Sequence, residues 1–302
     1  MADAIEAMRD AFLDLHAGNA VLQERVATSN AVGTHLSMPC SLGDYISLKS
    51  VTVFPGNAVK ELPTTQGALL LHSGKSGEAL ALMDAELLTQ VRTGAASALA
   101  SSLLARQPVK RVGLVGAGAI GEFQMRAMRV AFPEAECLIC DKDEDRARSV
   151  AASLGEGCQS AKIKDVLDCE VICLATSSTK PVLLGSKIKP GTHVNGVGSF
   201  RPDMAEVDLG FLQKANVYVD HLPAAQKSAG EMIQAVEAGG FSWSDVRGSI
   251  GELLAGAVAG RQDEGEVTFF KSVGVGVQDT AVAQIVYERA RERGLGQRFE
   301  LD

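Results

Sequence analysis

The chain has 302 residues, of which 46% are hydrophobic and 22% are charged, and its formal net charge is −8. This is the composition of an ordinary soluble globular protein, and the length allows two domains. The acidic balance, uninterrupted by any basic stripe, argues against a nucleic-acid partner. No apolar run approaches the roughly 20 residues of a membrane span.

The first region, residues 1–107, is expected to mix helices and strands. It begins with an acidic amphipathic helix at Ala2–His16, whereas a signal peptide would be basic and then apolar. Tyr45–Phe54 is rich in β-branched and aromatic residues, which favour a strand. Two more strands, Gln66–His72 and Ala79–Met83, precede a long helix that we expect to start at Leu87 and end at Arg106.

Two cations of this region stand where an anion can reach them. Lys49 lies in the apolar strand between Leu48 and Val51, and Arg92 lies near the start of the long helix beside Thr93. A strand lysine that faces solvent and an exposed helix arginine explain these positions equally well. The pattern alone therefore leaves both assignments open.

Residues 111–141 predict a dinucleotide-binding unit. A short apolar strand runs into a G-x-G-x-x-G pattern, and a helix with apolar residues at helical spacing follows. Gly116 permits the tight turn, Gly118 lets a pyrophosphate approach the backbone, and Gly121 lets the helix close on the strand. The N-terminus of that helix offers free N–H groups to phosphates.

The next apolar strand ends in Asp141, which lies 20 residues after Gly121. A carboxylate at this position accepts hydrogen bonds from the ribose hydroxyls of NAD. It would repel the 2′-phosphate of NADP, although Lys142 and Arg146 nearby soften that repulsion. NAD is therefore the expected cofactor, with NADP as the alternative.

The chain contains six cysteines, and Cys137 and Cys140 have the C-x-x-C spacing of a redox pair or half a zinc site. However, they lie within one apolar strand, where successive side chains face opposite ways, and no second ligand pair matches them. We therefore interpret them as structural and expect no bound metal. A reducing, cytoplasmic location fits this cysteine usage.

Three later strands, 170–176, 192–198 and 216–220, deliver small or polar residues to one edge of the predicted sheet. In an open α/β sheet, ligands lie at the carboxyl ends of the strands. The residues at these ends are Thr176, Ser177, Val197, Gly198 and Asp220. Asp220 has the position of an acid/base group beside a nicotinamide, and a cap for the following helix explains it equally well.

A strand and a long helix, Asp279–Arg293, close the chain, and this helix is expected to return to the first region. The glycine-rich stretch 272–276 before it is better explained by close packing at a helix start than by a phosphate loop. We therefore predict a substrate and dimerisation domain at 1–107, joined by 279–302, and a doubly wound dinucleotide-binding Rossmann domain at 108–278.

The order of these residues resembles the ornithine cyclodeaminase/mu-crystallin family, and the Lys49 and Arg92 segments are specific to it. The likeness covers nearly the full length, and we expect this chain to start some residues late, without the short opening strand of its relatives. The matching segments are Met38-Pro39, 48–57, 62–64, 83–85, 89–97, the glycine triplet, 195–204, Val219-Asp220 and 268–274.

The resemblance implies a homodimer in which Arg25, Lys49 and Arg92 hold the α-carboxylate of a small amino or imino acid. Asp220 and Lys49 are the implied catalytic residues. For Arg25, the preceding stretch 21–24 lacks the proline that is usual in the family. The residues expected to bind the cofactor are Gly116, Ala117, Gly118, Ala119, Ile120, Gly121, Asp141, Lys142, Thr93, Thr176, Ser177, Val197 and Gly198.

One departure from the family pattern bears on the substrate. Cyclodeaminases that act on ornithine place an acid two positions before the Met-Pro pair, to hold the distal ammonium, and this chain has Leu36 there. Leaving that ammonium unpaired would cost several kcal/mol. The pocket is therefore expected to take a less charged tail.

We expect a hydride-transfer enzyme that acts at the α-carbon of an amino or imino acid. Reduction of a ketimine, such as pyrroline-2-carboxylate to proline, is favoured. An alanine-type dehydrogenase and an ornithine cyclodeaminase that recycles NAD are the alternatives. The alternative of another class is a dinucleotide-dependent ligand-binding protein, as mu-crystallin is often viewed, and Asp141 argues against it because those relatives favour NADPH.

Overall fold

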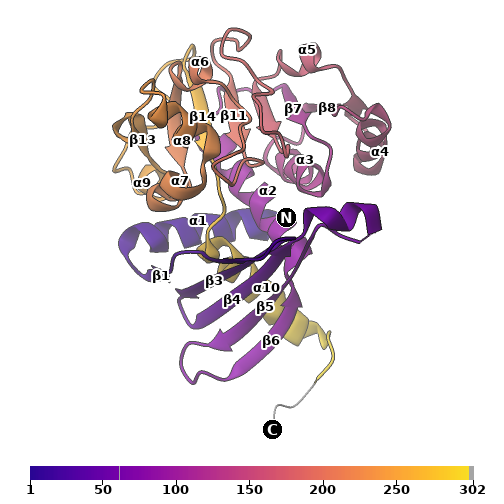
Figure 1. The fold of residues 1–302 in the computed structure, drawn as a ribbon, viewed down its shortest axis with the longest axis vertical. Coiled ribbons are helices and arrows are strands. Elements are labelled where there is room, and N and C mark those ends of the chain that lie inside the picture. The colour runs from indigo at the N-terminus through magenta and orange to yellow at the C-terminus, as the bar shows by residue number, and fades with distance from the viewer. Residues whose placement is uncertain (61, 299–302) are drawn as a thin grey trace.

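The computed structural model describes residues 1–60 and 62–298, which form two sheets with helices between and around them. Figure 1 shows the parallel sheet in the upper half and the antiparallel sheet in the lower half, with α1 (Ala2–Ala17) between them. The expected α/β fold class is confirmed.

The antiparallel sheet contains six strands in the order β1-β3-β4-β5-β6, with β2 paired to β3. Side chains alternate between its faces, so that Ser47 and Lys49 point inward while Ile46 and Leu48 point outward. The inner face packs against α2 (Ala85–Leu104) and α10 (Gly276–Arg293). The strands are β1 (Ala20–Leu22), β2 (Val26–Ser29), β3 (Thr34–Leu42), β4 (Tyr45–Val53), β5 (Thr65–Ser73) and β6 (Ala79–Asp84).

The parallel sheet contains eight strands in the order β13-β12-β14-β11-β10-β7-β8-β9. The chain enters at β7 and runs outward to β9, then returns to β10 and runs to the other edge. The strand order therefore reverses between β7 and β10, which is where open α/β sheets bind ligands. The strands are β7 (Arg111–Val115), β8 (Glu136–Cys140), β9 (Cys158–Ser160), β10 (Val171–Leu174), β11 (His193–Gly196), β12 (Ala215–Val219), β13 (Val246–Ser249) and β14 (Val267–Lys271).

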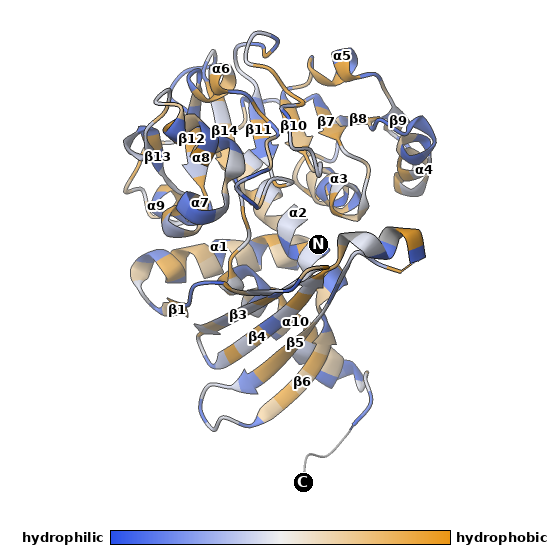
Figure 2. Ribbon diagram, in the orientation of Figure 1, coloured by the Kyte–Doolittle hydropathy of each residue, from blue (hydrophilic) through white to orange (hydrophobic). Residues whose placement is uncertain are grey.

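Shorter helices cover this sheet on both sides (Figure 1), so β10, β11 and β14 are buried along their whole length. Figure 2 shows the polar outer surfaces of α4 and α7 around this apolar centre. The remaining helices are α3 (Ala119–Ala131), α4 (Glu144–Leu154), α5 (Ile163–Val166), α6 (Leu209–Leu212), α7 (Leu222–Ser228), α8 (Gly230–Glu237), α9 (Ile250–Leu254), η1 (Pro55–Lys60) and η2 (Trp243–Asp245).

Helix α2 connects the two halves, and its residues 92–101 are all buried. Small side chains permit this, because a Cβ at Gly94 would lie 2.4 Å from the carbonyl oxygen of Phe123 on α3. The helix begins at Ala85, before the predicted Leu87, because the Asp84 side chain accepts the N–H groups of Glu86 and Leu87. This packing carries Arg92 into the space between the sheets.

The sequence pattern missed the short strands β1, β2, β9 and β13. All four residues of β2 are exposed, so the strand has no apolar alternation for a pattern to detect. Its pairing with β3 supplies the hydrogen bonds instead. Among the described residues, none of the helices combines the length and the apolar character that crossing a bilayer requires.

Candidate active site

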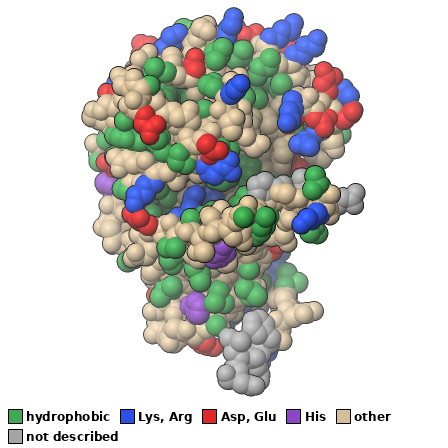
Figure 3. Space-filling model, viewed as in Figure 1, with side chains coloured by type: hydrophobic (Ala, Val, Ile, Leu, Met, Phe, Trp, Pro, Cys, Tyr) green, Lys and Arg blue, Asp and Glu red, His purple; other side chains and the backbone are tan. Residues whose placement is uncertain are grey.

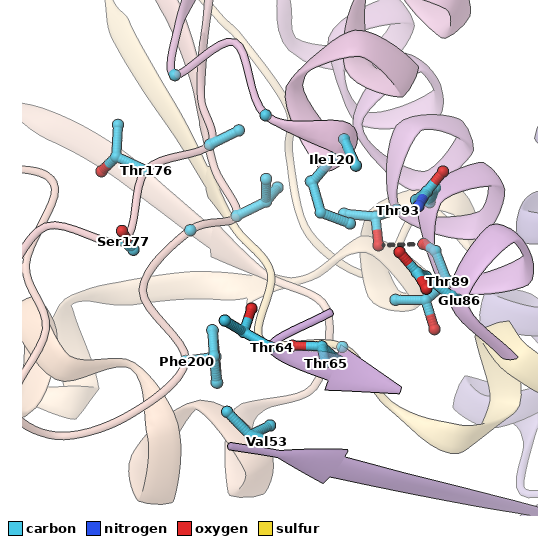
Figure 4. Close-up of a pocket in the computed structure, with 18 of the residues that line it drawn as sticks. Val53, Thr64, Thr65, Glu86, Thr89, Thr93, Ile120, Thr176, Ser177 and Phe200 are labelled. Atoms are coloured by element: carbon cyan, nitrogen blue, oxygen red, sulfur yellow. Dashed lines mark hydrogen bonds between the residues drawn. The ribbon is translucent and has the colours of Figure 1, made fainter. Parts of the chain in front are cut away.

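A cavity of about 1030 Å³ lies between the two sheets. The space-filling view shows the surface hollowed at this level (Figure 3). One wall comes from the antiparallel sheet and α2, and the other comes from the carboxyl ends of β7, β8, β10 and β11. In Figure 4, Thr176 and Ser177 lie across the cavity from Thr93 and Ile120, with Val53 and Phe200 on a third side.

The glycine pattern forms the turn from β7 into α3. Gly116 has a φ of 102°, in the left-handed region that favours glycine. A Cβ at Gly121 would lie 2.0 Å from the carbonyl oxygen of Gly116, so only glycine lets α3 pack this closely. At Gly118, the N-cap of α3, a Cβ would meet nothing within 4 Å, so the backbone there is open to the cavity. The geometry fits the pyrophosphate of a dinucleotide.

Asp141 follows β8 and its carboxylate turns toward this glycine turn. Its Oδ2 accepts the N–H of Ala117 at 2.7 Å, and its Oδ1 accepts the N–H of Asp143 at 2.9 Å. Lys142 and Arg146 line the same end of the cavity. The carboxylate is thus held where a ribose diol would lie, with two cations beside it.

The turns after β10 and β11 are held together by Glu206, which sequence analysis did not identify. Its Oε1 accepts the N–H and hydroxyl of Thr176 at 2.7 and 2.9 Å, while its Oε2 accepts the N–H groups of Gly198 and Ser199 at 2.7 and 3.2 Å. Burial raises the pKa of Glu206, and the nearby Lys271 opposes this effect. A single buried carboxylate therefore fixes both strand ends that face the cavity.

The three predicted cations come together at the opposite end of the cavity. Lys49 on β4 is 2% exposed, and its Nζ lies 2.8 Å from Oδ2 of Asp279 on α10. Arg92 donates from Nε to Oδ1 of the same carboxylate at 3.1 Å. Arg25 donates to the carbonyl oxygens of Val273 and Gly274, both at 2.9 Å. All three cations line the cavity.

Burial lowers the pKa of Lys49 to about 8, and the neighbouring Asp279 opposes this effect. Burial also lowers the pKa of Arg25 from its usual value, with Arg92 acting in the same direction. A substrate carboxylate placed here would be stabilised by cations that have little water around them.

The glycine-rich stretch before α10 was predicted to allow close packing at the start of the helix. The structure shows that it has a further role. Gly274 has a φ of 79°, and a Cβ there would lie 2.6 Å from an Nη of Arg92, so this glycine makes room for the guanidinium. Ser272, Val273 and Gly274 also line the cavity.

Asp220 lies directly behind this stretch, is 1% exposed, and does not itself line the cavity. Its Oδ2 accepts the hydroxyl of Ser272 at 2.8 Å and the N–H groups of Val273 and Gly274 at 2.9 and 2.8 Å. Its Oδ1 accepts the N–H of His221, which is the N-cap residue of α7, so this carboxylate does not cap the first turn of that helix as the alternative interpretation expected. The carboxylate thus reaches the cavity through the hydroxyl of Ser272.

The structure brings most of the predicted site residues to one cavity. Ala117 and Gly121 lie in the glycine turn but do not line the cavity. The predicted residues that line it are Arg25, Lys49, Arg92, Thr93, Gly116, Gly118, Ala119, Ile120, Asp141, Lys142, Thr176, Ser177, Val197 and Gly198. Among the described residues, no group of His, Cys, Asp or Glu is placed to hold a metal ion.

Gln278, Asp279 and Glu206 were not among the site residues predicted from the sequence. Gln278 accepts an Nη of Arg92 at 3.0 Å. The sequence contained a signal for these residues, because Gln278, Asp279 and Thr280 interrupt an otherwise apolar run. All three are fully buried in the structure. Polar residues within a buried apolar run need partners.

Comparison with known proteins agrees with this geometry. The model of the ornithine cyclodeaminase/mu-crystallin family matches residues 1–294. An alanine dehydrogenase from Archaeoglobus fulgidus is 35% identical over 303 residues, which cover 99% of this chain and 94% of the relative.

Two solved structures resemble the chain over almost its whole length. An archaeal alanine dehydrogenase dimer with bound NAD superimposes with a TM-score of 0.96 at 34% identity, covering 100% of this chain and 95% of the other. The Δ¹-pyrroline-2-carboxylate reductase of Thermococcus litoralis, in complex with NADH and L-proline, has a TM-score of 0.93 at 31% identity, with coverages of 98% and 95%.

We predict that Asp141→Asn weakens NADH binding and narrows the difference in affinity between NADH and NADPH. The substitution removes the charge that repels a 2′-phosphate, while Lys142 and Arg146 remain. Titration of cofactor fluorescence measures both dissociation constants. Asp145→Asn, at an exposed position on α4, is the matched control. An unchanged ratio of the two constants would contradict the assignment of Asp141 to the ribose.

Proposed function

This chain belongs to the ornithine cyclodeaminase/mu-crystallin family, and from this premise we propose that it is an NAD-dependent enzyme that reduces a ketimine with an α-carboxylate. Pyrroline-2-carboxylate, which would yield proline, is the model substrate. Related structures contain NAD or NADH, and one contains L-proline. The cofactor-facing turns described above support the same cofactor here.

The observation that carries this proposal is the apolar wall beside the three cations. Leu36 lies on β3 opposite Val51 of β4, and both line the cavity. Met38, the register partner of Lys49, also lines it, as does Phe200. A small ring with one carboxylate suits this combination, because the carboxylate meets cations and the ring meets apolar side chains.

The carboxylates that line the cavity in the described part of the chain do not replace the missing acid at position 36. Glu86 is exposed in the first turn of α2, and Asp141 is at the cofactor end. A second ammonium beside Leu36 would thus be desolvated without a partner. This argues against ornithine as the substrate.

In the proposed reaction, Arg25, Lys49 and Arg92 bind the carboxylate and orient the α-carbon. NADH held by the glycine turn and Asp141 would supply the hydride that this carbon accepts. The imine nitrogen takes up a proton as it becomes an amine, and Asp220 supplies that proton. The hydroxyl of Ser272 lies between the Asp220 carboxylate and the cavity, so it stands on the path of that proton.

A second candidate is an alanine-type dehydrogenase, which is favoured by the likeness to the Archaeoglobus enzyme. It would use the same groups, because pyruvate and ammonia form an imino acid that also carries an α-carboxylate. The two candidates differ in the size of the tail that the apolar wall accepts.

Oxidation of NADH by the purified protein should separate these functions. Pyrroline-2-carboxylate, piperideine-2-carboxylate and pyruvate with ammonium are tested with NADH and NADPH, and ornithine is incubated with catalytic NAD. Faster turnover of a cyclic imine is expected. Faster turnover with pyruvate and ammonium selects the dehydrogenase, whereas proline formed from ornithine contradicts the argument from Leu36. Ligand binding without turnover in any assay indicates a binding protein.

We predict that Asp220→Asn lowers kcat by roughly 10²–10⁴-fold, because the amide cannot carry the proton. Affinity for NADH should stay near that of the wild type, since Asp220 does not line the cavity. Steady-state kinetics and cofactor titration are the measurements, with the exposed Asp10→Asn as control. If turnover is unchanged, Asp220 is only a structural acceptor for the backbone around it.

The proposal includes a homodimer formed through the outer face of the antiparallel sheet. Pro39, Leu48, Leu70 and Leu82 form one row across four strands of that face. Leu48 is 39% exposed and Leu82 is 60% exposed. Figure 2 shows apolar segments on β4, β5 and β6 in this region. A contiguous apolar sheet face favours burial against a partner.

We retain the two predicted domains, one formed by residues 1–107 with 279–302 and the other by residues 108–278. Residues 299–302 lie outside the described residues. Helix α10 supports it, because it packs against β3 and β4. A reducing, cytoplasmic location is also proposed, supported by six cysteines that are all free thiols.

We predict that Leu48→Glu weakens the dimer, since a charge in the centre of the row must be desolvated when two faces meet. Light scattering coupled to size-exclusion chromatography would then report a lower mass than for the wild type. Leu184→Glu, at a similarly exposed leucine outside this sheet, should leave the mass unchanged. An unaltered dimer in Leu48→Glu would place the interface elsewhere.

A further inference from the structure

Asp279 has an unusual position for a residue that does not line the cavity. It lies in the first turn of α10, is fully buried, and has one oxygen on each of two cations. Oδ2 lies 2.8 Å from Nζ of Lys49, and Oδ1 lies 3.1 Å from Nε of Arg92. The N-terminal end of a helix favours a carboxylate there. This one carboxylate therefore bridges β4, α2 and α10.

Gln278 completes the arrangement around Arg92. Its Oε1 accepts an Nη of Arg92 at 3.0 Å and the N–H of Val275 at 3.0 Å. The guanidinium is thus held on two edges, by Asp279 and by Gln278, and its position against Gly274 is set. A planar guanidinium held at two edges keeps its remaining donors in one direction.

The ammonium of Lys49 has several charged neighbours. Asp279 faces it from α10, Arg92 from α2, and Arg25 from the segment between β1 and β2. Its register partners on β3 and β5, Met38 and Leu69, carry no charge. Burial and the two arginines all disfavour the charged ammonium, and Asp279 is the carboxylate that opposes them.

The charges around this end of the cavity are one anion short of balance. Arg25, Lys49 and Arg92 supply three positive charges, and Asp279 and Asp220, which also interacts with Arg25, supply two negative charges. One positive charge is left. A ligand with a single carboxylate would neutralise the group, which is the match that the proposed substrate offers.

We propose that Asp279 is a positioning residue which keeps the Lys49 ammonium charged and the Arg92 guanidinium aligned, so that the anion site is assembled before the substrate arrives. The inference rests on the proposed function for the identity of the substrate. The role of Asp279 itself is tested by binding of an anion and needs no turnover.

The pH dependence of binding follows from the position of Lys49. Its pKa is lowered to about 8, so the ammonium loses its proton as the pH rises through that value, and affinity for a carboxylate falls. Without Asp279, the pKa of Lys49 falls further, and the loss of affinity begins at a lower pH. At pH values below the lowered pKa of Lys49, the site without Asp279 has a net charge that is more positive by one, because a carboxylate has been removed, and it still attracts the anion.

The probe is pyrrole-2-carboxylate, a planar five-membered ring whose carboxylate stays ionised and whose ring nitrogen does not titrate near neutral pH. Its dissociation constant from the enzyme–NADH complex is measured by NADH fluorescence from about two pH units below to about two above the pKa of Lys49. Wild-type protein should lose up to about tenfold in affinity per pH unit above about pH 8.

In Asp279→Asn, the midpoint of this profile should move down by at least about one pH unit, with affinity near that of the wild type at the acidic end. A purely structural role for Asp279 would weaken binding equally at every pH. Equal weakening, or an unchanged midpoint, overturns the proposal. Glu292→Gln, at an exposed position on the same helix, is the matched control.

Two further variants keep the test decisive if Asp279→Asn does not fold, as judged by thermal unfolding and NADH binding. Lys49→Gln should show a flat profile, and a slope that persists there would assign the titration to another group and overturn the proposal. Asp279→Glu retains the charge but displaces it, so its midpoint should stay near that of the wild type while affinity falls. Unchanged affinity would also overturn it.

If the wild type binds pyrrole-2-carboxylate with this profile but turns over no imine or amino acid, the proposed reaction fails while the role of Asp279 stands. If turnover occurs and the profile of Asp279→Asn matches that of the wild type, the reaction stands and the role of Asp279 fails. The two proposals are therefore separable.

Discussion

A buried ammonium needs a carboxylate, and here this requirement joins distant parts of the chain. The bond from Arg92 to Asp279 spans 187 positions, and Lys49 shares the same carboxylate from a third element. Breaking a buried ion pair by removing one partner costs several kcal/mol, because the other charge remains desolvated. The strand β4, the helix α2 and the helix α10 are therefore held in one arrangement by a carboxylate that does not itself line the cavity.

The opposite end of the cavity uses a buried carboxylate in a similar way. Glu206 accepts hydrogen bonds from the turns after β10 and β11, which face the cavity. A carboxylate with two oxygens can satisfy several N–H donors that the end of a parallel strand leaves free. Neither Glu206 nor Asp279 lines the cavity, yet each holds in place the residues that do.

The two ends together explain why the site lies between the sheets. The reversal of strand order between β7 and β10 opens a crevice at the carboxyl ends of the parallel strands. The antiparallel sheet places Leu36, Met38 and Lys49 on the facing wall. A ligand between them meets glycine-rich backbone on one side and cations with apolar side chains on the other.

Much of this arrangement was predictable from the amino-acid sequence. The glycine pattern after an apolar strand and the carboxylate at Asp141 carry local spacing that only a few folds use, so the dinucleotide site could be predicted in detail. The α/β fold class followed from the alternation of strands and helices. The sequence pattern alone did not decide whether Lys49 and Arg92 face solvent or the interior. The resemblance to the family was needed to predict that they face inward.

Only the tertiary structure decided which groups partner these residues. Asp279 lies 187 positions from Arg92, and Glu206 joins Thr176, 30 positions away, to Gly198, 8 positions away, and no local periodicity encodes such pairing. Short exposed strands such as β2 were likewise invisible, because long-range hydrogen bonds rather than side-chain burial hold them. Local spacing determined the glycine turn, whereas burial and charge pairing, which exist only after folding, determined how Arg25, Lys49 and Arg92 gather at the cavity.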